Sequence, residues 1–573
     1  MKTLAIIGMG PRGLFALEQV LLHLGKTNTP LNIIVFEIHN NLGTGAAWSL
    51  NQPESNWVNI TERALQDLKG RASFNFNTEN IPSFPSYHEW CKFKLKSQEV
   101  DTFPPRRFIG KYLNERSNTL VNALKNYNTF KIINSLVNAI NEDQKKLYLK
   151  TENAEIYEVD EVLLTIGHQS TNTSKEIKDW KAHTGSSKNS TIKTFENAYP
   201  VEQFSALKNT KNTVIGFRGH GLATIDVMRF LVNNTFGNFE VTDNDTFKTV
   251  YHSTNTQHIK LIPYSLNGDP LAPKPLNAEI DNWFKPTKHD LDTFESQIKN
   301  VADGYTEVTD ISFLTTAFSK IAARIFINLK AKALPHSYTV TVIENQVLHW
   351  SNNDPINTDL SDNETSPYKR IENLIQMALG KQLVSLEYCI GQVWRHCQPT
   401  LYASFSHAKL NDDIIQQVIA LDESTKRFSY GPPIESMQQV LALVDAKIMD
   451  LDFVNNPDIE LVDNGWKLTN TSGDSITINS MINCVLDGPK LLDVNTPIIT
   501  SLLQNDLIKP LHSELGIETQ EDGRVISENG NILPIAVLGR LAKGSVIGVD
   551  AILECFGERI TNWAKAFAKR HQH

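Results

Sequence analysis

The chain opens with a short apolar run, a glycine-rich turn and a segment in which apolar residues recur at helical spacing. Residues 4–7 contain no polar side chain, which is typical of a strand buried on both faces of a parallel sheet. In residues 14–24, apolar side chains then recur with the period of a helix. The pattern predicts a strand, a turn and a helix in direct succession.

The turn between them has the spacing G-x-G-x-x-G, formed by Gly8, Gly10 and Gly13. Gly8 permits a tight turn, Gly10 lets the backbone approach a pyrophosphate, and Gly13 lets the helix pack close to the strand. Free N–H groups at the start of the helix favour phosphates. We therefore predict a dinucleotide site here, with Pro11 and Arg12 of the same turn also at the cofactor.

A second apolar run at residues 31–36 ends in Glu37, close to the ~20-residue spacing expected of an acid that binds ribose hydroxyls. The loop at residues 41–48 that follows is rich in small residues and includes Gly45 and Trp48. We interpret this loop as contacting a flat ligand, with Trp48 stacked on it. An ordinary surface loop is the alternative.

A helix predicted over residues 106–126 begins with Arg106 and Arg107. Two arginines at a helix N-terminus oppose the helix dipole, so we expect an anion to face them. A ligand phosphate and a buried carboxylate both fit this expectation.

Short apolar runs at 130–133, 137–140, 147–150 and 154–157 predict a small antiparallel ribbon. Residues 159–168 then predict a strand that closes in a turn containing Thr165 and Gly167.

A second strand, glycine turn and helix follow at residues 212–232, with Gly219 and Gly221 in the turn and Asp226 in the helix. This pattern predicts a second nucleotide fold. The alternative is a structural strand–helix turn that binds no ligand, because it would have the same sequence pattern. The next strand, at 259–265, ends with neither an acid nor an arginine, so nothing there selects NAD over NADP.

Helical periodicity dominates from about residue 290 to 450, at 311–329, 368–379, 410–421 and 434–449. This region would form either a lid over a substrate or a scaffold between domains. Strand patterns return from residue 459, and a last helix is predicted over 550–569.

The predicted fold class is α/β, with two Rossmann-like dinucleotide-binding domains and a helical insertion. The expected division is an FAD-binding domain at 1–170, a second nucleotide-binding domain at 205–300, the insertion at 301–455, and a return to the first domain at 456–573.

Composition narrows the function classes. With 573 residues the chain is long enough for several domains. Its net charge of −9 argues against nucleic acid or an anionic membrane as a partner. The five cysteines form no C-x-x-C pair, which disfavours a dithiol reductase, and no metal site is expected. No signal or membrane-spanning segment is evident, so we expect a cytoplasmic protein.

These motifs together resemble the FAD/NAD(P)-binding family of two-dinucleotide-binding flavoproteins, akin to the flavin-dependent N-hydroxylating monooxygenases. The resemblance extends over the chain apart from its helical middle. It rests on six stretches, at residues 8–13, 43–48, 105–113, 164–168, 219–226 and 537–544.

The resemblance implies that FAD is held by the first glycine turn and Glu37, with further contacts from residues spread along the chain. It likewise implies that a nicotinamide cofactor binds at the second glycine turn. The further FAD contacts are Val137, Thr165, Gly167, Gly539, Gly544 and Ser545, and the implied nicotinamide contacts are Gly219, Gly221 and Asp226.

The implied activity is that of an oxidoreductase in which NAD(P)H reduces FAD and oxygen is used to hydroxylate a small amine or amino acid. We expect Arg106 and Arg107 to contact the substrate or another anion. The alternative is a flavin-binding sensor or scaffold that does not turn over.

Overall fold

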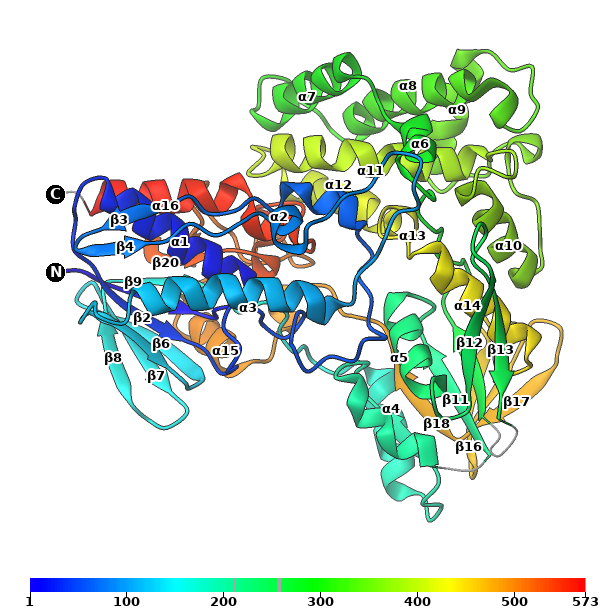
Figure 1. Ribbon diagram of the computed structural model, residues 1–573, viewed down its shortest axis with the longest axis horizontal. Coiled ribbons are helices and arrows are strands. Elements are labelled where there is room, and N and C mark those ends of the chain that lie inside the picture. The colour runs from blue at the N-terminus through cyan, green and yellow to red at the C-terminus, as the bar shows by residue number, and fades with distance from the viewer. Residues whose placement is uncertain (210–211, 255–258, 572–573) are drawn as a thin grey trace.

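The computed structural model describes residues 1–209, 212–254 and 259–571. Two parallel sheets and a helical insertion confirm the predicted α/β class (Figure 1). The first sheet and its helices lie at the left of this view, the second sheet at the lower right, and the insertion at the upper right. Both chain ends lie at the first sheet.

The first sheet is parallel except at one edge. Its buried strand β1 has Leu4 and Ile6 on one face and Ala5 and Ile7 on the other, all at most 5% exposed. This confirms a strand covered on both sides. The strand order is β19 (Arg524–Ile526), β20 (Ile532–Val537), β9 (Glu161–Leu164), β1 (Thr3–Ile7), β2 (Asn32–Phe36) and β5 (Phe130–Ile133), with β19 antiparallel.

Each face of the first sheet has its own cover. On one face, α1 and α16 pack against each other and, with the end of α3, bury a shared core (Figure 1). A three-stranded antiparallel ribbon and α15 cover the other face. The elements are α1 (Pro11–Gly25), α3 (Arg106–Ala123), α15 (Pro497–Gln504), α16 (Glu558–Arg570), and the ribbon strands β6 (Val137–Asp143), β7 (Lys146–Thr151) and β8 (Ile156–Val159).

The placement of residues 130–133 in the ribbon was wrong. These residues form β5, which pairs in parallel with β2 at the edge of the first sheet. Ribbon strands and sheet-edge strands are equally short and apolar, so local patterning does not specify the partner. The loops of residues 51–100 also contain a hairpin of β3 (Phe74–Phe76) and β4 (Glu79–Ile81), with the short helix α2 (Tyr87–Cys91).

The second sheet confirms the second strand–turn–helix unit. Its strands run parallel in the order β10 (Lys193–Phe195), β18 (Ser480–Asn483), β11 (Thr213–Arg218) and β14 (Ile259–Tyr264). Around it lie α4 (Lys175–Ser186), α5 (Leu222–Val232), the hairpin β12 (Gly237–Asp243) and β13 (Lys248–Ser253), and the ribbon β15 (Asp458–Val462), β16 (Gly465–Thr469) and β17 (Ser475–Ile478).

The predicted return to the first domain at residue 456 was too early. Strand β18 pairs with β10 and β11, and the β15–β17 ribbon packs beside β11. The chain therefore completes the second sheet before it re-enters the first domain. The boundary was missed because residues on both sides of it have strand periodicity, and periodicity does not identify the sheet.

The insertion is built on α11, whose residues are mostly buried against α7, α8 and α13. The four predicted helices are confirmed, whereas α7, α9 and α11 were missed. In α11, Gly391 and Pro399 interrupt the helical pattern. Its helices are α6 (Ala278–Asp281), α7 (Lys288–Ala302), α8 (Ser312–Leu329), α9 (Val340–Ser351), α10 (Pro367–Ala378), α11 (Leu386–Phe405), α12 (Asp412–Ser424), α13 (Lys426–Ser429) and α14 (Ile434–Asp445).

Three negative findings apply to the residues that the structure describes. No helix there has the length and apolar character needed to cross a bilayer. No group of metal-ligating side chains comes together there. The five cysteines are unpaired.

A buried ion-pair cluster fixes α1 against α3. The Glu18 carboxylate of α1 accepts from Arg116 of α3 at 2.6 and 2.9 Å, and from Arg71 of the preceding loop at 2.6 Å. All three side chains are at most 7% exposed. Such a cluster positions the helix that follows the first glycine turn.

We expect Glu18→Ala to lower the free energy of unfolding by about 3–5 kcal/mol, because two buried guanidinium groups lose their partner. Urea unfolding followed by circular dichroism measures this change. Asp292→Ala is the matched control, because Asp292 forms an exposed pair with Lys288 on α7 and its loss should cost under about 0.5 kcal/mol. Equal losses in the two variants would contradict a stabilising role for the cluster.

Candidate functional site

The first glycine turn brings strand and helix into direct backbone contact. A Cβ atom at Gly13 would lie 2.2 Å from the carbonyl oxygen of Gly8, so only glycine fits there. Gly8 has φ +92° and its N–H donates to Phe36 O at 2.9 Å. Gly10 is the N-cap of α1 and Pro11 is its first residue. The first N–H groups of α1 thus point past the end of β1.

Glu37 closes this turn from the neighbouring strand. Its carboxylate accepts from Met9 N at 2.6 Å and His39 N at 2.8 Å, and the residue is 6% exposed. A carboxylate has about four acceptor positions, so two remain for ligand hydroxyl groups. The ribose contact predicted for Glu37 is compatible with this position.

The small-residue loop lies directly against the turn. Gly43 N donates to Met9 O at 2.7 Å, and Gly45, with φ +56°, has its Cα 3.6 Å from where a Gly10 Cβ would be. Trp48 packs with a separate apolar cluster that includes Val58 and Ile552. The stacking of Trp48 on a ligand stays a prediction.

Thr165 connects the returning strand to the same turn, since its hydroxyl donates to Gly8 O at 2.5 Å. Gly167 follows with φ +69° and no atom within 4 Å of a Cβ placed on it. Space therefore lies open beside the turn. Val137 is buried at the start of β6, beneath the other face of the sheet.

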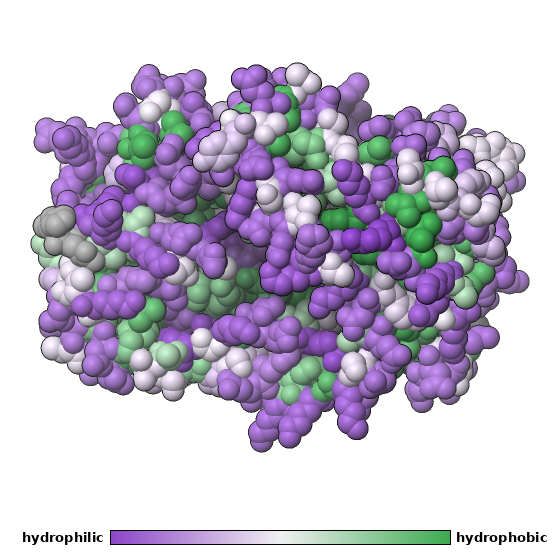
Figure 2. All heavy atoms as spheres, turned by 90° about the horizontal axis from the view of Figure 1, so that it is seen from above, coloured by the Kyte–Doolittle hydropathy of each residue, from purple (hydrophilic) through white to green (hydrophobic). Residues whose placement is uncertain are grey.

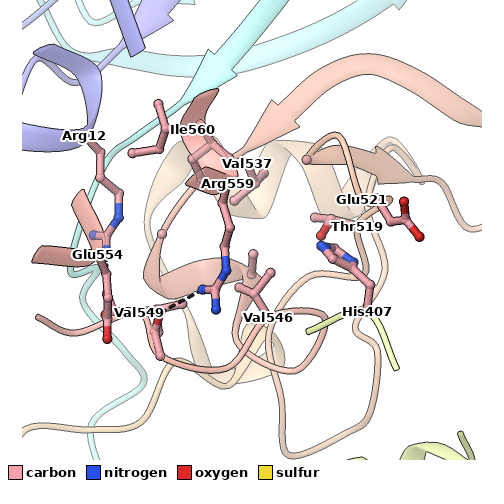
Figure 3. Close-up of a pocket in the computed structure, with 15 residues that line it drawn as sticks. Arg12, His407, Thr519, Glu521, Val537, Val546, Val549, Glu554, Arg559 and Ile560 are labelled. Carbon is pink, nitrogen blue, oxygen red and sulfur yellow. Dashed lines mark hydrogen bonds between the residues drawn. The ribbon is translucent and has the colours of Figure 1, made fainter. Parts of the chain in front are cut away.

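The carboxy-terminal segment forms a pocket with Arg12 (Figure 3). Arg12 donates to Val549 O and lies about 3.1 Å from where a Gly539 Cβ would be. Arg12 and Glu554 lie at one end of the pocket, and His407 of the insertion lies at the other with Thr519 and Glu521. The pocket spans about 440 Å³, counted out to the open solvent.

Arg559 lies between the two ends of this pocket and donates to Gly548 O at 2.8 Å (Figure 3). Gly544 packs against Leu511 and Leu515, and the Ser545 hydroxyl accepts from Thr519 N at 2.9 Å. These contacts shape the wall of the pocket.

The start predicted for the last helix was wrong. Helix α16 begins at Glu558 rather than at residue 550, and Gly557 is its N-cap. The Arg12 and Arg559 contacts with the 547–549 backbone hold the preceding segment outside the helix.

The second glycine turn repeats the backbone of the first. Gly219 has φ +116° and donates to Tyr264 O at 2.7 Å, as Gly8 does to Phe36 O. Gly221 is the N-cap of α5, as Gly10 is of α1. Thr224 replaces the third glycine, and its hydroxyl donates to Gly219 O at 2.6 Å.

The two turns differ in their polar groups. Ser265 stands after β14 where Glu37 stands after β2. His220 occupies the middle of the second turn, and burial lowers its pKa to about 4. Its Nδ1 atom is buried and has no hydrogen-bond partner among the described residues.

The anion opposite Arg106 is a buried carboxylate of the chain. Arg106 donates to Asp226 at 2.6 Å, and Tyr199 donates to the same oxygen at 2.5 Å. Burial, followed by the Asp226 carboxylate, raises the pKa of Tyr199. Arg107 pairs with Glu54 at the surface. The structure thus brings Arg106 and Asp226 together, whereas Arg107 lies apart from them.

Sequence reasoning missed a charged network that joins the insertion to the carboxy-terminal segment. Lys426 donates to Asp550 at 2.8 Å, and Lys543 pairs with Glu423. Burial opposes the ionisation of Asp550, but Lys426 and then Lys543 outweigh it and hold its pKa below the usual value. No local motif identifies these residues, because Glu423 and Lys426 lie more than 110 positions before Lys543 and Asp550 in the chain.

The face of the molecule seen from above is hollowed near its middle (Figure 2). Its rim is mostly hydrophilic, with hydrophobic residues deeper in.

Comparison with known proteins identifies the first segment. Residues 5–169 match the family described as FAD-NAD(P)-binding. No curated protein sequence matches the chain. The match covers the first glycine turn, Glu37, Thr165 and Gly167.

Similar solved structures include three oxygenases, each covering nearly the whole chain. Ornithine N-hydroxylase of Kutzneria sp. 744 has a TM-score of 0.45 at 10% identity, covering 99% of each chain. L-lysine 6-monooxygenase of Pseudomonas syringae has a TM-score of 0.44 at 10% sequence identity, and the alignment covers 100% of each chain. A cyclohexanone monooxygenase mutant of Rhodococcus sp. Phi1 has a TM-score of 0.43 at 12% sequence identity, and the alignment covers 100% of this chain and 87% of that one.

Residues 5–169 therefore resemble, in sequence, the family described as FAD-NAD(P)-binding, and the first glycine turn lies within the matched stretch.

Proposed function

We propose that this protein is an FAD-dependent oxidoreductase that uses NAD(P)H and oxygen to hydroxylate a small amine or amino acid. FAD would bind at the first glycine turn and the nicotinamide cofactor at the second. When bound, FAD supplies the redox chemistry, taking hydride from the nicotinamide and activating oxygen.

The fit of the first turn to a dinucleotide carries the proposal. Gly10 and Gly45 face each other without side chains, and Gly13 holds the helix N-terminus against the strand. The N-terminus of α1 suits a pyrophosphate, and the spare acceptor positions of Glu37 suit a ribose. The open space beside Gly167 leaves room for the rest of the cofactor.

The chain's own residues would orient the cofactor and exclude water. Arg12 ties the turn to the 547–549 backbone, so that turn and carboxy-terminal segment form one wall. Two ion pairs hold the insertion against that wall: Lys426 pairs with Asp550, and Glu423 pairs with Lys543. A site closed in this way protects a reactive intermediate from solvent.

The repeated backbone of the second turn supports a nicotinamide site. A Cβ at Gly221 would meet no atom within 4 Å, so the N-cap of α5 is open in the way a pyrophosphate requires. With Ser265 at the Glu37 position, no carboxylate would repel a 2′-phosphate at the end of β14.

A flavin-binding sensor or scaffold without turnover is the second candidate. It is favoured by the engagement of Asp226 with Arg106 and Tyr199, because a carboxylate used in this way is less available to a nicotinamide cofactor.

The two candidates are separated by stopped-flow measurement of flavin absorbance after mixing with NADH or NADPH. We expect rapid bleaching with at least one of them, and oxygen uptake that increases with one member of a panel of amines and amino acids. A flavin that binds but stays oxidised with both nicotinamides would favour the sensor. A protein that binds no FAD would overturn both candidates.

We expect Gly10→Ala to reduce FAD content at least tenfold while leaving the melting temperature of the flavin-free protein unchanged. The added methyl group would make only ordinary contacts with Gly45, so it interferes with a ligand rather than with folding. The ratio of flavin to protein absorbance measures the effect. Gly185→Ala on α4, where a Cβ also has free space, should retain full FAD content.

We expect Gly221→Ala to raise the KM for the nicotinamide cofactor at least tenfold with FAD content unchanged, because the methyl group projects into open space at the N-cap of α5. Steady-state oxidation of NADH and NADPH measures it. An unchanged KM would show that the second turn is structural only.

A further inference from the structure

A short loop at residues 485–488, directly after β18, lies between the two glycine turns. At its start it touches the second turn, because a Cβ placed on Gly219 would lie 3.3 Å from Cγ2 of Val485. Near its end it touches the first domain, because Arg540 donates to Asp487 O at 2.8 Å. The loop therefore spans from the second turn to the segment that follows β20.

The same loop is fixed to the first domain at a second point. Thr171, which lies between β9 and α4, donates to the Asp487 carboxylate at 2.7 Å. Arg540 in turn follows Gly539, and a Cβ placed on Gly539 would lie 3.1 Å from the Arg12 side chain. A continuous series of contacts thus joins the second glycine turn to the first.

Apolar side chains are exposed on this loop. Val485 is 40% exposed and Leu486 is 50% exposed. Exposed hydrophobic residues that occur singly are ordinary on a protein surface. Among the large hydrophobic residues that are exposed in the described part of the chain, however, only these two are consecutive. A Cβ placed on Gly488 would meet no atom within 4 Å, so the end of the loop is uncovered as well.

The position of the loop matters because of the reaction in the proposed function, on which this inference rests. A nicotinamide cofactor bound at the second turn has to reduce FAD bound at the first. The reacting atoms must come within about 3–3.5 Å of each other. The nicotinamide ring must therefore extend from the second turn toward the first, along the gap that residues 485–488 line.

We infer that Val485 and Leu486 form an apolar seat for the nicotinamide ring, and that Arg540 is a positioning residue that holds this seat through Asp487 O. The faces of the ring are flat and weakly hydrated. Placing one face on two exposed aliphatic side chains removes apolar surface from water on both partners. The adenosine and pyrophosphate would lie at the second turn instead.

The test compares ligands that have the ring with ligands that lack it. Tetrahydro-NADH and tetrahydro-NADPH are unreactive analogues of the reduced cofactors, whereas ADP-ribose and 2′-phospho-ADP-ribose have no nicotinamide. Isothermal titration of the full-length, flavin-loaded protein measures the affinity for each ligand. We expect the ring to strengthen binding at least tenfold in one of the two pairs. A ring that adds nothing to the affinity would overturn the inference.

Leu486→Gln should remove most of the affinity that the ring contributes, while the affinity for ADP-ribose and the FAD content stay unchanged. Leu461→Gln is the matched control, because Leu461 lies on β15 and is 46% exposed. This control should keep the full contribution of the ring. A contribution that is unchanged in Leu486→Gln, or an equal loss for ligands with and without the ring, would contradict the seat.

Arg540→Met should slow flavin reduction by saturating NAD(P)H at least tenfold, with the affinity for ADP-ribose unchanged, because the seat moves while the second turn does not. Arg540→Lys can still donate to Asp487 O and should restore part of the rate. Stopped-flow absorbance of the flavin measures both variants. A rate that is unchanged in Arg540→Met would overturn the positioning role.

Failure of this inference and failure of the proposed function give different results. If the wild-type protein binds the ADP-ribose ligands and its flavin is bleached by a nicotinamide, but Leu486→Gln has no effect, the seat alone is wrong. If the wild-type protein binds none of the four ligands, the proposed nicotinamide site is itself wrong.

Discussion

The contact between Gly13 and the carbonyl of Gly8 is the constraint on which the first domain depends. At this contact a helix and a buried strand approach more closely than any side chain allows. The approach aims the amides of α1 past the sheet edge, where Glu37 and Thr165 fasten the turn from the strands on either side. Glu18 then fixes the same helix from its other face.

The second turn reaches the same backbone by a different route. Thr224 spans the distance that glycine closes in the first turn, and its hydroxyl satisfies the Gly219 carbonyl. A looser glycine pattern therefore does not mean a looser turn. What differs is polarity, since Ser265 and a neutral His220 replace Glu37 and Met9.

Buried charges connect the three parts of the molecule. Arg106 of the first domain reaches Asp226 on α5, and Arg229 of α5 lies 3.9 Å from the Trp57 ring while donating to Gln439 of α14. Lys426 and Glu423 of the insertion pair with Asp550 and Lys543 of the carboxy-terminal segment. Each group is costly to bury alone, so these pairs favour one arrangement of the domains.

The sequence by itself determined both strand–turn–helix units, because a buried strand, a glycine turn and an amphipathic helix are encoded by neighbouring residues. It also determined four helices of the insertion, α8, α10, α12 and α14, though not α11, where Gly391 and Pro399 interrupt the pattern. Only the tertiary structure decided that β5 joins the first sheet, that β18 joins the second, and that Asp226 faces Arg106. Strand pairing and buried ion pairs involve residues far apart along the chain. Local periodicity therefore does not predict which of these residues come into contact.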